Sequence, residues 1–290
     1  MKILFDIGHP GHLHYFRNTA KILEKKGHET FFTTRDKDVT LKLFKAYNIP
    51  FYRTGKNKAG LFNKAYTLFN TTWEIYKYAK KVKPDIIVNF FLPFAGIAGR
   101  LLKIPVIGFD DTEHAKFSNG IAKKFTDTIF VPASFQVVHS VNEIRFNSHM
   151  ELCYLLPKYF SPDNSIYHDL NISKDIKYVI LRFISWTANH DIGATGLTYE
   201  DKMKLVSMLS KKYKVFISSE GKLPAEFSAY QINIPPEKMH DALYFAQLYI
   251  GEGATMASEA ALLGTPSIYI NSLDAGCIQE QVDGGLMYSF

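Results

Sequence analysis

Residues 251–271 read GEGATMASEAALLGTPSIYIN, and Glu259 is an acid within a run of small and apolar residues that is typical of a short helix. A strand that ends at Ile250 is followed by a glycine-containing turn, and Thr255 can cap a helix that runs to about Gly264. Free backbone N–H groups and the helix dipole favour a phosphate at the start of such a helix. The segment therefore predicts a phosphate site.

The same junction predicts how a nucleotide is held. Gly251 and Gly253 let a phosphate approach the turn, which continues through Ala254 and Thr255. Glu259, about one turn into the helix, can accept two hydrogen bonds from the vicinal hydroxyls of a ribose. The alternative is an acid that only complements the helix dipole, which contributes about 0.3–1 kcal/mol. The motif alone does not decide between the two.

Three histidines follow the first predicted strand, in the segment DIGHPGHLH. The G-x-G-x-x-G fingerprint of dinucleotide-binding proteins is absent there, which argues against NAD. A histidine at the carboxyl end of a strand has a pKa suited to removing a proton from a hydroxyl group. His9, His12 and His14 are candidates, and their spacing would also allow a metal, although most such histidines bond locally.

An acidic cluster, FDDTEHA, follows a later predicted strand. Asp110, Asp111, Glu113 and His114 crowd one turn, and neighbouring acids raise one another's pKa, which suits one of them for proton transfer. The alternative is a helix-capping cluster with Asp111 or Thr112 as the N-cap residue. The two interpretations are evenly supported by these residues alone.

Arg182 ends the predicted strand YVILRF and can pair with a phosphate through two parallel hydrogen bonds. His190 lies on the Gly-rich segment that follows, and Ser219 ends the next predicted strand, where it can help to hold a base or phosphate. A lone arginine is more often part of a surface ion pair. The prediction therefore rests on the position of these residues at strand ends.

The elements that position these residues alternate between apolar β-rich runs and amphipathic segments. This alternation predicts two doubly wound, Rossmann-like parallel-sheet α/β domains that face a cleft, with ligands beyond the carboxyl ends of their strands. The pattern blurs between residues 133 and 175, so we predict domains over 1–158 and 159–290. Strands are predicted over 2–7, 29–34, 85–90, 104–109, 127–132, 178–183, 214–219, 248–250 and 266–270.

The composition is that of an ordinary globular protein, with 47% hydrophobic and 21% charged residues among 290. The first residues predict a buried strand and no signal peptide, and no run approaches the ~20 apolar residues that span a bilayer. We therefore expect a cytoplasmic protein. Cys153 and Cys277 have no disulfide or zinc spacing and are expected to be buried thiols.

The net charge of +6 is unevenly divided. Residues 1–158 carry +11 and residues 159–290 carry −5, so the basic half is expected to meet an anionic partner such as a glycan or a phospholipid surface, without a nucleic-acid-binding module. The stretch 56–83 places Phe62, Tyr66, Phe69, Trp73 and Tyr76 near one helical face. An interfacial membrane helix has this pattern, but a core-facing helix with a solvated lysine face is the more ordinary interpretation.

GEGATMASEAALLGTPSIYI (251–270) resembles the donor-binding segment of GT-B glycosyltransferases and UDP-N-acetylglucosamine 2-epimerases, which implies that Glu259 binds ribose. With FDIGHPGHLHYF (5–16), DDTEHA (110–115) and LRFISWTANHDIGATGL (181–197), nearly the whole chain resembles an uncharacterised prokaryotic family of predicted glycosyltransferases. The first of these three also resembles the Gly-Gly-His loop of the peptidoglycan lipid-linked N-acetylglucosaminyltransferase.

That loop selects His12 as the general base, with Gly11, His9, His14 and Asp110 on the acceptor side. The resemblance implies a metal-independent, inverting transfer of a sugar from a nucleoside diphosphate sugar, most simply a UDP-sugar, without a cofactor. The acceptor would be a hydroxyl of a glycan or lipid-linked molecule in cell-surface polysaccharide synthesis, which would bring the protein to the inner membrane face.

Two alternatives remain open. DDTEHA is similar in position to the HVEAG element of the 2-epimerases, which implies a non-hydrolysing epimerase of a UDP-N-acetylhexosamine with Asp111 or Glu113 in catalysis. A catalytically silent nucleotide-sugar-binding protein is the other. The sequence ends at GGLMYSF, where GT-B proteins continue through further helices, so those helices are expected to be missing.

Overall fold

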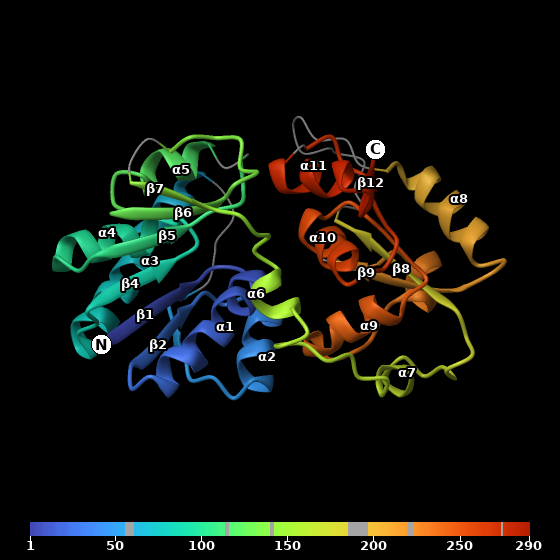
Figure 1. Cartoon of the computed structure of the whole chain (residues 1–290), viewed down its shortest axis with the longest axis horizontal. Helices are drawn as coiled ribbons and strands as arrows, with labels where there is room; N and C mark the ends of the chain where they lie inside the picture. The colour runs from blue at the N-terminus through green and yellow to red at the C-terminus, as the bar shows by residue number, and fades with distance from the viewer. Residues whose placement is uncertain (56–60, 114–115, 140–141, 185–196, 220–222, 274) are drawn as a thin grey trace. The chain divides into compact units, whose positions relative to one another are not determined.

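The computed structural model describes residues 1–55, 61–113, 116–139, 142–184, 197–219, 223–273 and 275–290, without the side chains of 61–64, 116 and 117. The chain forms two compact units, Met1–Tyr154 (unit 1) and Leu155–Phe290 (unit 2). Each unit has its own parallel sheet and its own core, as in the GT-B architecture (Figure 1). The division lies four residues before the boundary predicted from the sequence.

Unit 1 is built on a seven-stranded sheet in the order β3-β2-β1-β4-β5-β6-β7, with all pairs parallel. Its strands are β1 (Lys2–Ile7), β2 (Glu29–Thr34), β3 (Tyr52–Arg53), β4 (Ile86–Asn89), β5 (Val106–Phe109), β6 (Thr128–Pro132) and β7 (Glu143–Phe146). Its helices are α1 (Pro10–Lys25), α2 (Asp38–Ala46), α3 (Leu61–Val82), α4 (Pro93–Leu102), α5 (Lys116–Ala122) and α6 (Leu152–Leu155), the last of which crosses the division.

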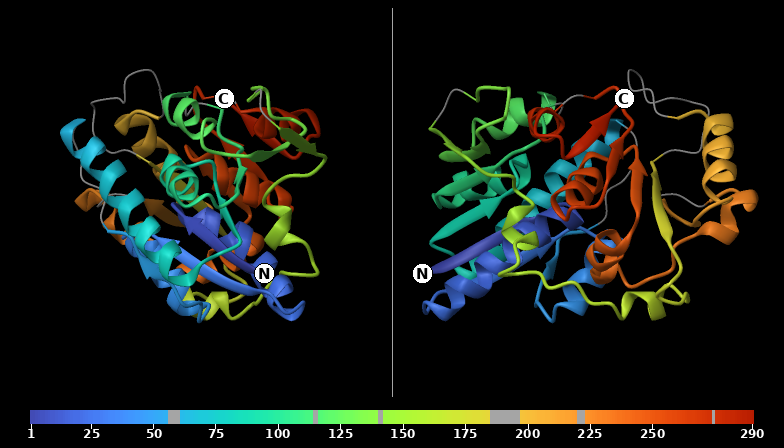
Figure 2. Two further views of the ribbon diagram at one scale, coloured as in Figure 1. Left: turned by 90° about the vertical axis from the view of Figure 1, so that its left-hand side faces the viewer. Right: turned by 45° about the vertical axis from the view of Figure 1, so that its right-hand side comes forward.

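Helices cover both faces of this sheet, which is why its central strands are mostly apolar and buried. In β1 every residue after Lys2 is buried. On the face covered by α3 and α4, Leu4 and Ile87 pack with Ile75 and Ala98. The long α3 runs beside α4, and α1 and α2 contact each other on the opposite side (Figure 2).

Unit 2 has a five-stranded parallel sheet in the order β12-β11-β10-β8-β9. Its strands are β8 (Tyr178–Phe183), β9 (Lys214–Ser219), β10 (Leu248–Gly251), β11 (Ser267–Tyr269) and β12 (Met287–Ser289). Its helices are α7 (Ile166–Asp169), α8 (Tyr199–Leu209), α9 (Met239–Phe245), α10 (Ala254–Leu262) and α11 (Gly276–Asp283), with 3₁₀ turns η1 (Ala225–Tyr230) and η2 (Pro236–Lys238).

Alternate side chains of β8 point into two separate hydrophobic cores of unit 2. Tyr178 and Ile180 join the core formed with α9, α10 and α11, whereas Val179 and Leu181 join the core formed with α8. Successive strand residues point to opposite faces, so Arg182 lies on the same face as Tyr178 and Ile180. This parity puts Arg182 on the side of the sheet that carries α10.

Strand order reverses once in each sheet. In unit 1 the reversal lies between β1 and β4, and in unit 2 it lies between β8 and β10. Ligands of open parallel sheets bind at the carboxyl ends of the strands at such a switch point. His9 and the first turn of α1, with His12, follow β1, and the glycine-containing turn follows β10, which ends at Gly251, so both predicted sites lie at these positions.

Three expectations about local structure are wrong. Thr255 does not cap α10, because the helix begins at Ala254 with Gly253 as its N-cap residue. The aromatic residues predicted on one face of α3 do not all face the core, since Tyr66, Phe69 and Trp73 are exposed while Tyr76 packs against it. Cys153 is exposed and Cys277 is only partly buried, so neither is a fully buried thiol. None of the described helices combines the length and apolar character needed to cross a membrane.

Candidate functional site

His12 lies at the switch point of unit 1, in the first turn of α1. Its ring stacks on Phe90, just after β4, with centroids 4.3 Å apart. Its Nδ1 accepts a hydrogen bond from the backbone N–H of Gly8 at 3.3 Å, so in the neutral ring the proton is on Nε2. Burial, followed by the positive charges of His9, Arg35 and Lys37, holds the pKa of His12 well below its usual value. His12 is therefore a neutral hydrogen-bond donor in this geometry.

The other two histidines and Gly11 take different places. His9 is the N-cap residue of α1, and its Nδ1 accepts from the backbone N–H of Gly11 at 3.3 Å. His14 is buried and packs against Tyr47 and Tyr154. The rings of His9 and His12 are neighbours, with centroids 5.7 Å apart, whereas His14 packs elsewhere. Among the residues that the structure describes, no group of three metal-binding side chains has a suitable arrangement.

Asp111 lies beyond the carboxyl end of β5. Tyr15 Oη donates to its Oδ2 at 3.2 Å, and the Thr112 hydroxyl donates to its Oδ1 at 3.0 Å. Burial, followed by the charge of Asp110, raises the pKa of Asp111 to about 7. Tyr15 also stacks on Phe90, with centroids 5.1 Å apart, so Phe90 contacts both the His12 ring and the partner of Asp111.

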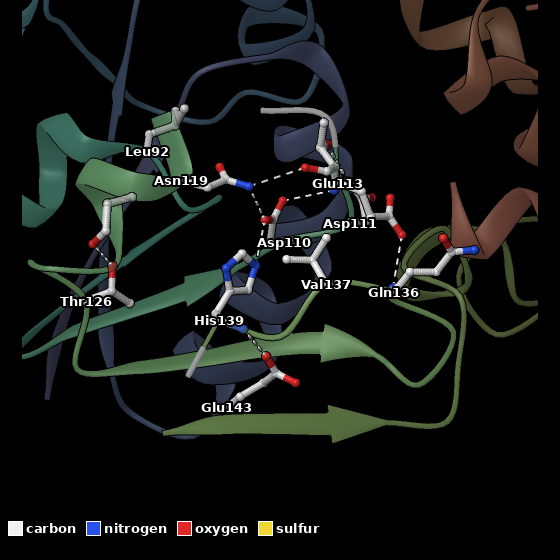
Figure 3. A network of polar contacts seen from close by, with 12 residues as sticks. Leu92, Asp110, Asp111, Glu113, Asn119, Thr126, Gln136, Val137, His139 and Glu143 are labelled. Carbon is white, nitrogen blue, oxygen red and sulfur yellow. Dashed lines mark hydrogen bonds and ion pairs between the residues drawn. The ribbon is translucent and has the colours of Figure 1, made fainter. Parts of the chain in front are cut away.

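Three polar contacts hold the carboxylate of Asp110 in place (Figure 3). Its Oδ2 lies 3.1 Å from Nε2 of His139 and accepts from Nδ2 of Asn119 at 3.0 Å, while Oδ1 accepts from the N–H of Thr112 at 2.9 Å. Asp110 and His139 are both buried. Burial raises the pKa of Asp110, and the hydrogen bond with His139 opposes that shift. This network fixes the turn that carries Asp111.

Glu113 lies behind this turn, where its Oε1 accepts from the backbone N–H of Gln136 at 3.4 Å. The side chain is buried. Neither Asp111 nor Thr112 is the N-cap residue of a described helix, because Glu113 lies in a turn and the described part of α5 is Lys116–Ala122. His114 lies outside the described residues. Sequence reasoning missed His139, Asn119 and Tyr15, which come from separate elements, because no local spacing links them to the acids.

In unit 2, Arg182 and Gly251 are directly paired across β8 and β10. Arg182 donates from Nη1 to the hydroxyl of Ser218 at 2.9 Å. A side chain at Gly251 would collide with Tyr249 Oη and with Cβ of Arg182, which explains the glycine. Ser219 ends β9 and is paired with Phe183. His190 lies outside the described residues.

Glu259, on the buried face of α10, is hydrogen-bonded within unit 2. Its Oε1 lies 2.9 Å from Nε2 of His240 in α9, and the two residues are 5% and 4% exposed. The Tyr249 hydroxyl is buried nearby and has no hydrogen-bond partner among the residues that the structure describes. Burial raises its pKa, on which the charges of Arg182 and Glu259 also act. No spacing in the sequence linked His240 to Glu259.

Glu252, between the two glycines of the turn, has a different role. Its carboxylate pairs with Lys202 of α8 at 3.0 Å, and both side chains are about 5% exposed. It also accepts from the backbone N–H groups of Ile184 at 2.7 Å and Leu197 at 3.0 Å. Glu252 therefore fixes the turn after β10 to α8 and to the residue that follows β8. No sequence spacing indicated this pair.

The sequence of this chain is similar to those of known proteins. An uncharacterized protein of Methanocaldococcus jannaschii, MJ0665, is 27% identical over 92% of this chain and 81% of its own length. The UDP-N-acetylglucosamine–N-acetylmuramyl-(pentapeptide) pyrophosphoryl-undecaprenol N-acetylglucosamine transferase of Acinetobacter baumannii is 27% identical over 49% of this chain, a match that spans 43% of the transferase.

The fold is similar to that of the UDP-GlcNAc 2-epimerase of M. jannaschii, solved in complex with UDP-GlcNAc and UDP. That structure matches with a TM-score of 0.66 and 14% identity, over 100% of this chain and 89% of the epimerase. At this identity the likeness establishes the GT-B-like fold. The sequence profile that matches residues 1–289 identifies this chain as a member of the family described as "Protein of unknown function (DUF354)".

Proposed function

We propose that this protein is a GT-B-type glycosyltransferase that moves a sugar from a nucleoside diphosphate sugar, most simply a UDP-sugar, to a hydroxyl acceptor. One observation carries the proposal. The first turn of α10 has no side-chain cap, begins at the switch point of unit 2, and shares a sheet face with Arg182. A diphosphate needs this combination of free N–H groups and a guanidinium.

Glu259 is the proposed ribose ligand. The contact with His240 orients the Glu259 carboxylate. Because Glu259 is only 5% exposed, the ribose hydroxyls would have to reach the edge of the carboxylate that His240 does not contact. The ribose must therefore fit closely against α10. Measurement of nucleotide affinity tests this directly.

Asp111 is a better candidate base than His12. The Nδ1 lone pair of His12 is engaged by Gly8, whereas a carboxyl group with a pKa of about 7 accepts a proton readily near neutral pH. The acceptor hydroxyl would give its proton to Asp111 as its oxygen bonds to C1 of the sugar, and the C1–O bond to the diphosphate breaks. Arg182 and the α10 N–H groups would stabilise the departing negative charge. A single displacement of this kind inverts the anomeric centre.

A nucleotide-sugar 2-epimerase is the second candidate, and the acid at the end of β5 favours it. Removal of the proton at C2 also needs a group like Asp111 with a pKa near 7. The UDP-GlcNAc-bound epimerase of similar fold adds support for this substrate class.

One experiment separates these functions. The protein is incubated with UDP-N-acetylglucosamine in deuterated water, with and without a panel of hydroxyl acceptors. Deuterium at C2 indicates the epimerase, release of UDP with a glycosylated acceptor indicates the transferase, and thermal stabilisation without turnover indicates a silent binding protein. If none of the UDP-, GDP-, dTDP- or CMP-sugars raises the melting temperature, nucleotide-sugar binding is ruled out.

A further inference from the structure

Helix α3 exposes three aromatic side chains to solvent, while its Tyr76 and Tyr78 pack against the core. Tyr66, Phe69 and Trp73 are 52%, 71% and 48% exposed. They are spaced by three and four residues, so they form one stripe. The opposite side of the helix is buried through Ile75 and Ala79, together with Thr67, Thr71 and Thr72. Burying threonines while exposing a tryptophan and a phenylalanine is the reverse of an ordinary surface helix.

The same stripe continues into lysines. Lys77 and Lys80 follow Trp73 at four and seven residues, and both are exposed. Residues 53–83 contain eight Lys and Arg and one acid, Glu74. The acid is already engaged, since its carboxylate contacts Nζ of Lys77 at 2.6 Å and accepts from Tyr52 Oη at 2.8 Å. The outer face of α3 is thus aromatic at one end and cationic at the other.

We propose that the outer face of α3 docks unit 1 on an anionic phospholipid surface. Aromatic rings with exposed edges enter the boundary between headgroups and acyl chains, where their polar atoms stay hydrated. Lysine stems extend along the apolar layer while their ammonium groups contact lipid phosphates. The continuous stripe from Tyr66 to Lys80 supplies both contacts from one rigid element.

A second copy of the chain fits this face less well. Docking of two α3 faces would bring two sets of exposed lysines together, and the single acid of the stretch is already paired. A lipid bilayer with anionic headgroups complements the charge, and it needs no matching shape. The inference is independent of the proposed enzymatic function, because lipid binding is measured without a nucleotide sugar.

The test is flotation of the full chain with vesicles of phosphatidylcholine alone or with 30% phosphatidylglycerol. We expect binding only to the anionic vesicles, and weaker binding as salt rises. The double variant Phe69→Ser/Trp73→Ser should lose at least tenfold in apparent affinity. Lys77→Glu/Lys80→Glu should lose about 25-fold or more, at about fivefold per lysine contact.

The matched control is Lys204→Glu/Lys211→Glu, which makes the same charge change at exposed positions of unit 2. This control should bind vesicles within twofold of the parent chain. Equal losses in the control and the α3 variants would overturn the proposal, as would equal binding to both vesicle types. A dimer in the parent chain that Phe69→Ser/Trp73→Ser dissociates would also overturn it, by assigning the face to a second copy.

A second measurement follows Trp73 itself. The chain has two tryptophans, so Trp186→Phe leaves Trp73 as the single emitter. Anionic vesicles with brominated acyl chains should quench this emission, while the same lipids without bromine should not. Absence of quenching in vesicle-bound protein would contradict insertion of the α3 face. Circular dichroism of every variant confirms that losses do not come from unfolding.

Discussion

Nε2 of His240 lies 2.9 Å from Oε1 of Glu259, and both side chains are almost fully buried. The contact joins α9 to α10, two helices on the same face of the unit 2 sheet. Because a hydrogen bond in such a low-dielectric setting holds its partners firmly, the Glu259 carboxylate has a fixed orientation. This pair connects the packing of unit 2 to the proposed ribose contact.

Glu259→Gln should weaken UDP-sugar binding about tenfold or more, because hydrogen bonds to an ionised acceptor contribute about 1.5–3 kcal/mol. The amide keeps the size of the side chain and can still bond to His240, so the loss of stability should be small. Isothermal titration calorimetry with UDP and UDP-N-acetylglucosamine measures the affinity, and urea denaturation measures the stability. Undiminished nucleotide affinity in a folded Glu259→Gln chain would remove Glu259 from the ribose site.

His240→Ala should reduce the free energy of unfolding by about 1–3 kcal/mol, because it leaves a buried carboxylate without this partner. His240→Gln should restore part of that loss. Chemical denaturation at pH 7.5 gives both values. If His240→Ala is as stable as the parent chain, the pair does not hold Glu259 in the folded state.

The pH profile of turnover should distinguish Asp111 from His12 as the base. With a pKa of about 7, Asp111 is half-protonated at neutral pH, so activity should rise through pH 7 and level off above pH 8. A base at His12 would already be deprotonated far below that, since its pKa lies well below the usual value. The observed midpoint of kcat/KM against pH decides between them, with Asp111→Asn and His12→Gln as the variants to compare.

Asp111→Asn should stabilise the fold at neutral and alkaline pH. The pKa of Asp111 is raised on folding, so the folded state binds more protons between about pH 4 and pH 7, and the parent chain loses stability as pH rises through that window. The difference between variant and parent should grow to as much as about 4 kcal/mol, at about 1.4 kcal/mol per pH unit. Denaturation at pH 5 and pH 8 checks this, and a constant difference at both would contradict it.

Glu252→Gln should destabilise unit 2 by about 3–5 kcal/mol, because it leaves the Lys202 ammonium buried without its ion-pair partner. The double variant Glu252→Gln/Lys202→Met removes both charges and should recover much of the loss. Urea denaturation of the parent, single and double variants forms the cycle. Additive effects of the two substitutions would show that the pair is not coupled.

The strand pattern was readable from the sequence because buried parallel strands are continuous apolar runs. KILFDI and YVILRF became β1 and β8 with the predicted bounds. The short β3, β7 and β12 were missed, since edge strands of two to four residues lack such a run. The start of α10 was misplaced by two residues because Thr255 is a good capping residue, although Gly253 takes that position.

By itself, the sequence determined the two parallel sheets, the glycine turn after β10 and the acids after β5, because period, turn chemistry and strand ends are local properties. Only the tertiary structure decided which side chains are partners. His240 with Glu259, His139 with Asp110 and Lys202 with Glu252 are separated by 19, 29 and 50 residues. It also decided that Tyr66, Phe69 and Trp73 of α3 face outward, since an amphipathic helix has two faces and only packing against the sheet selects the buried one.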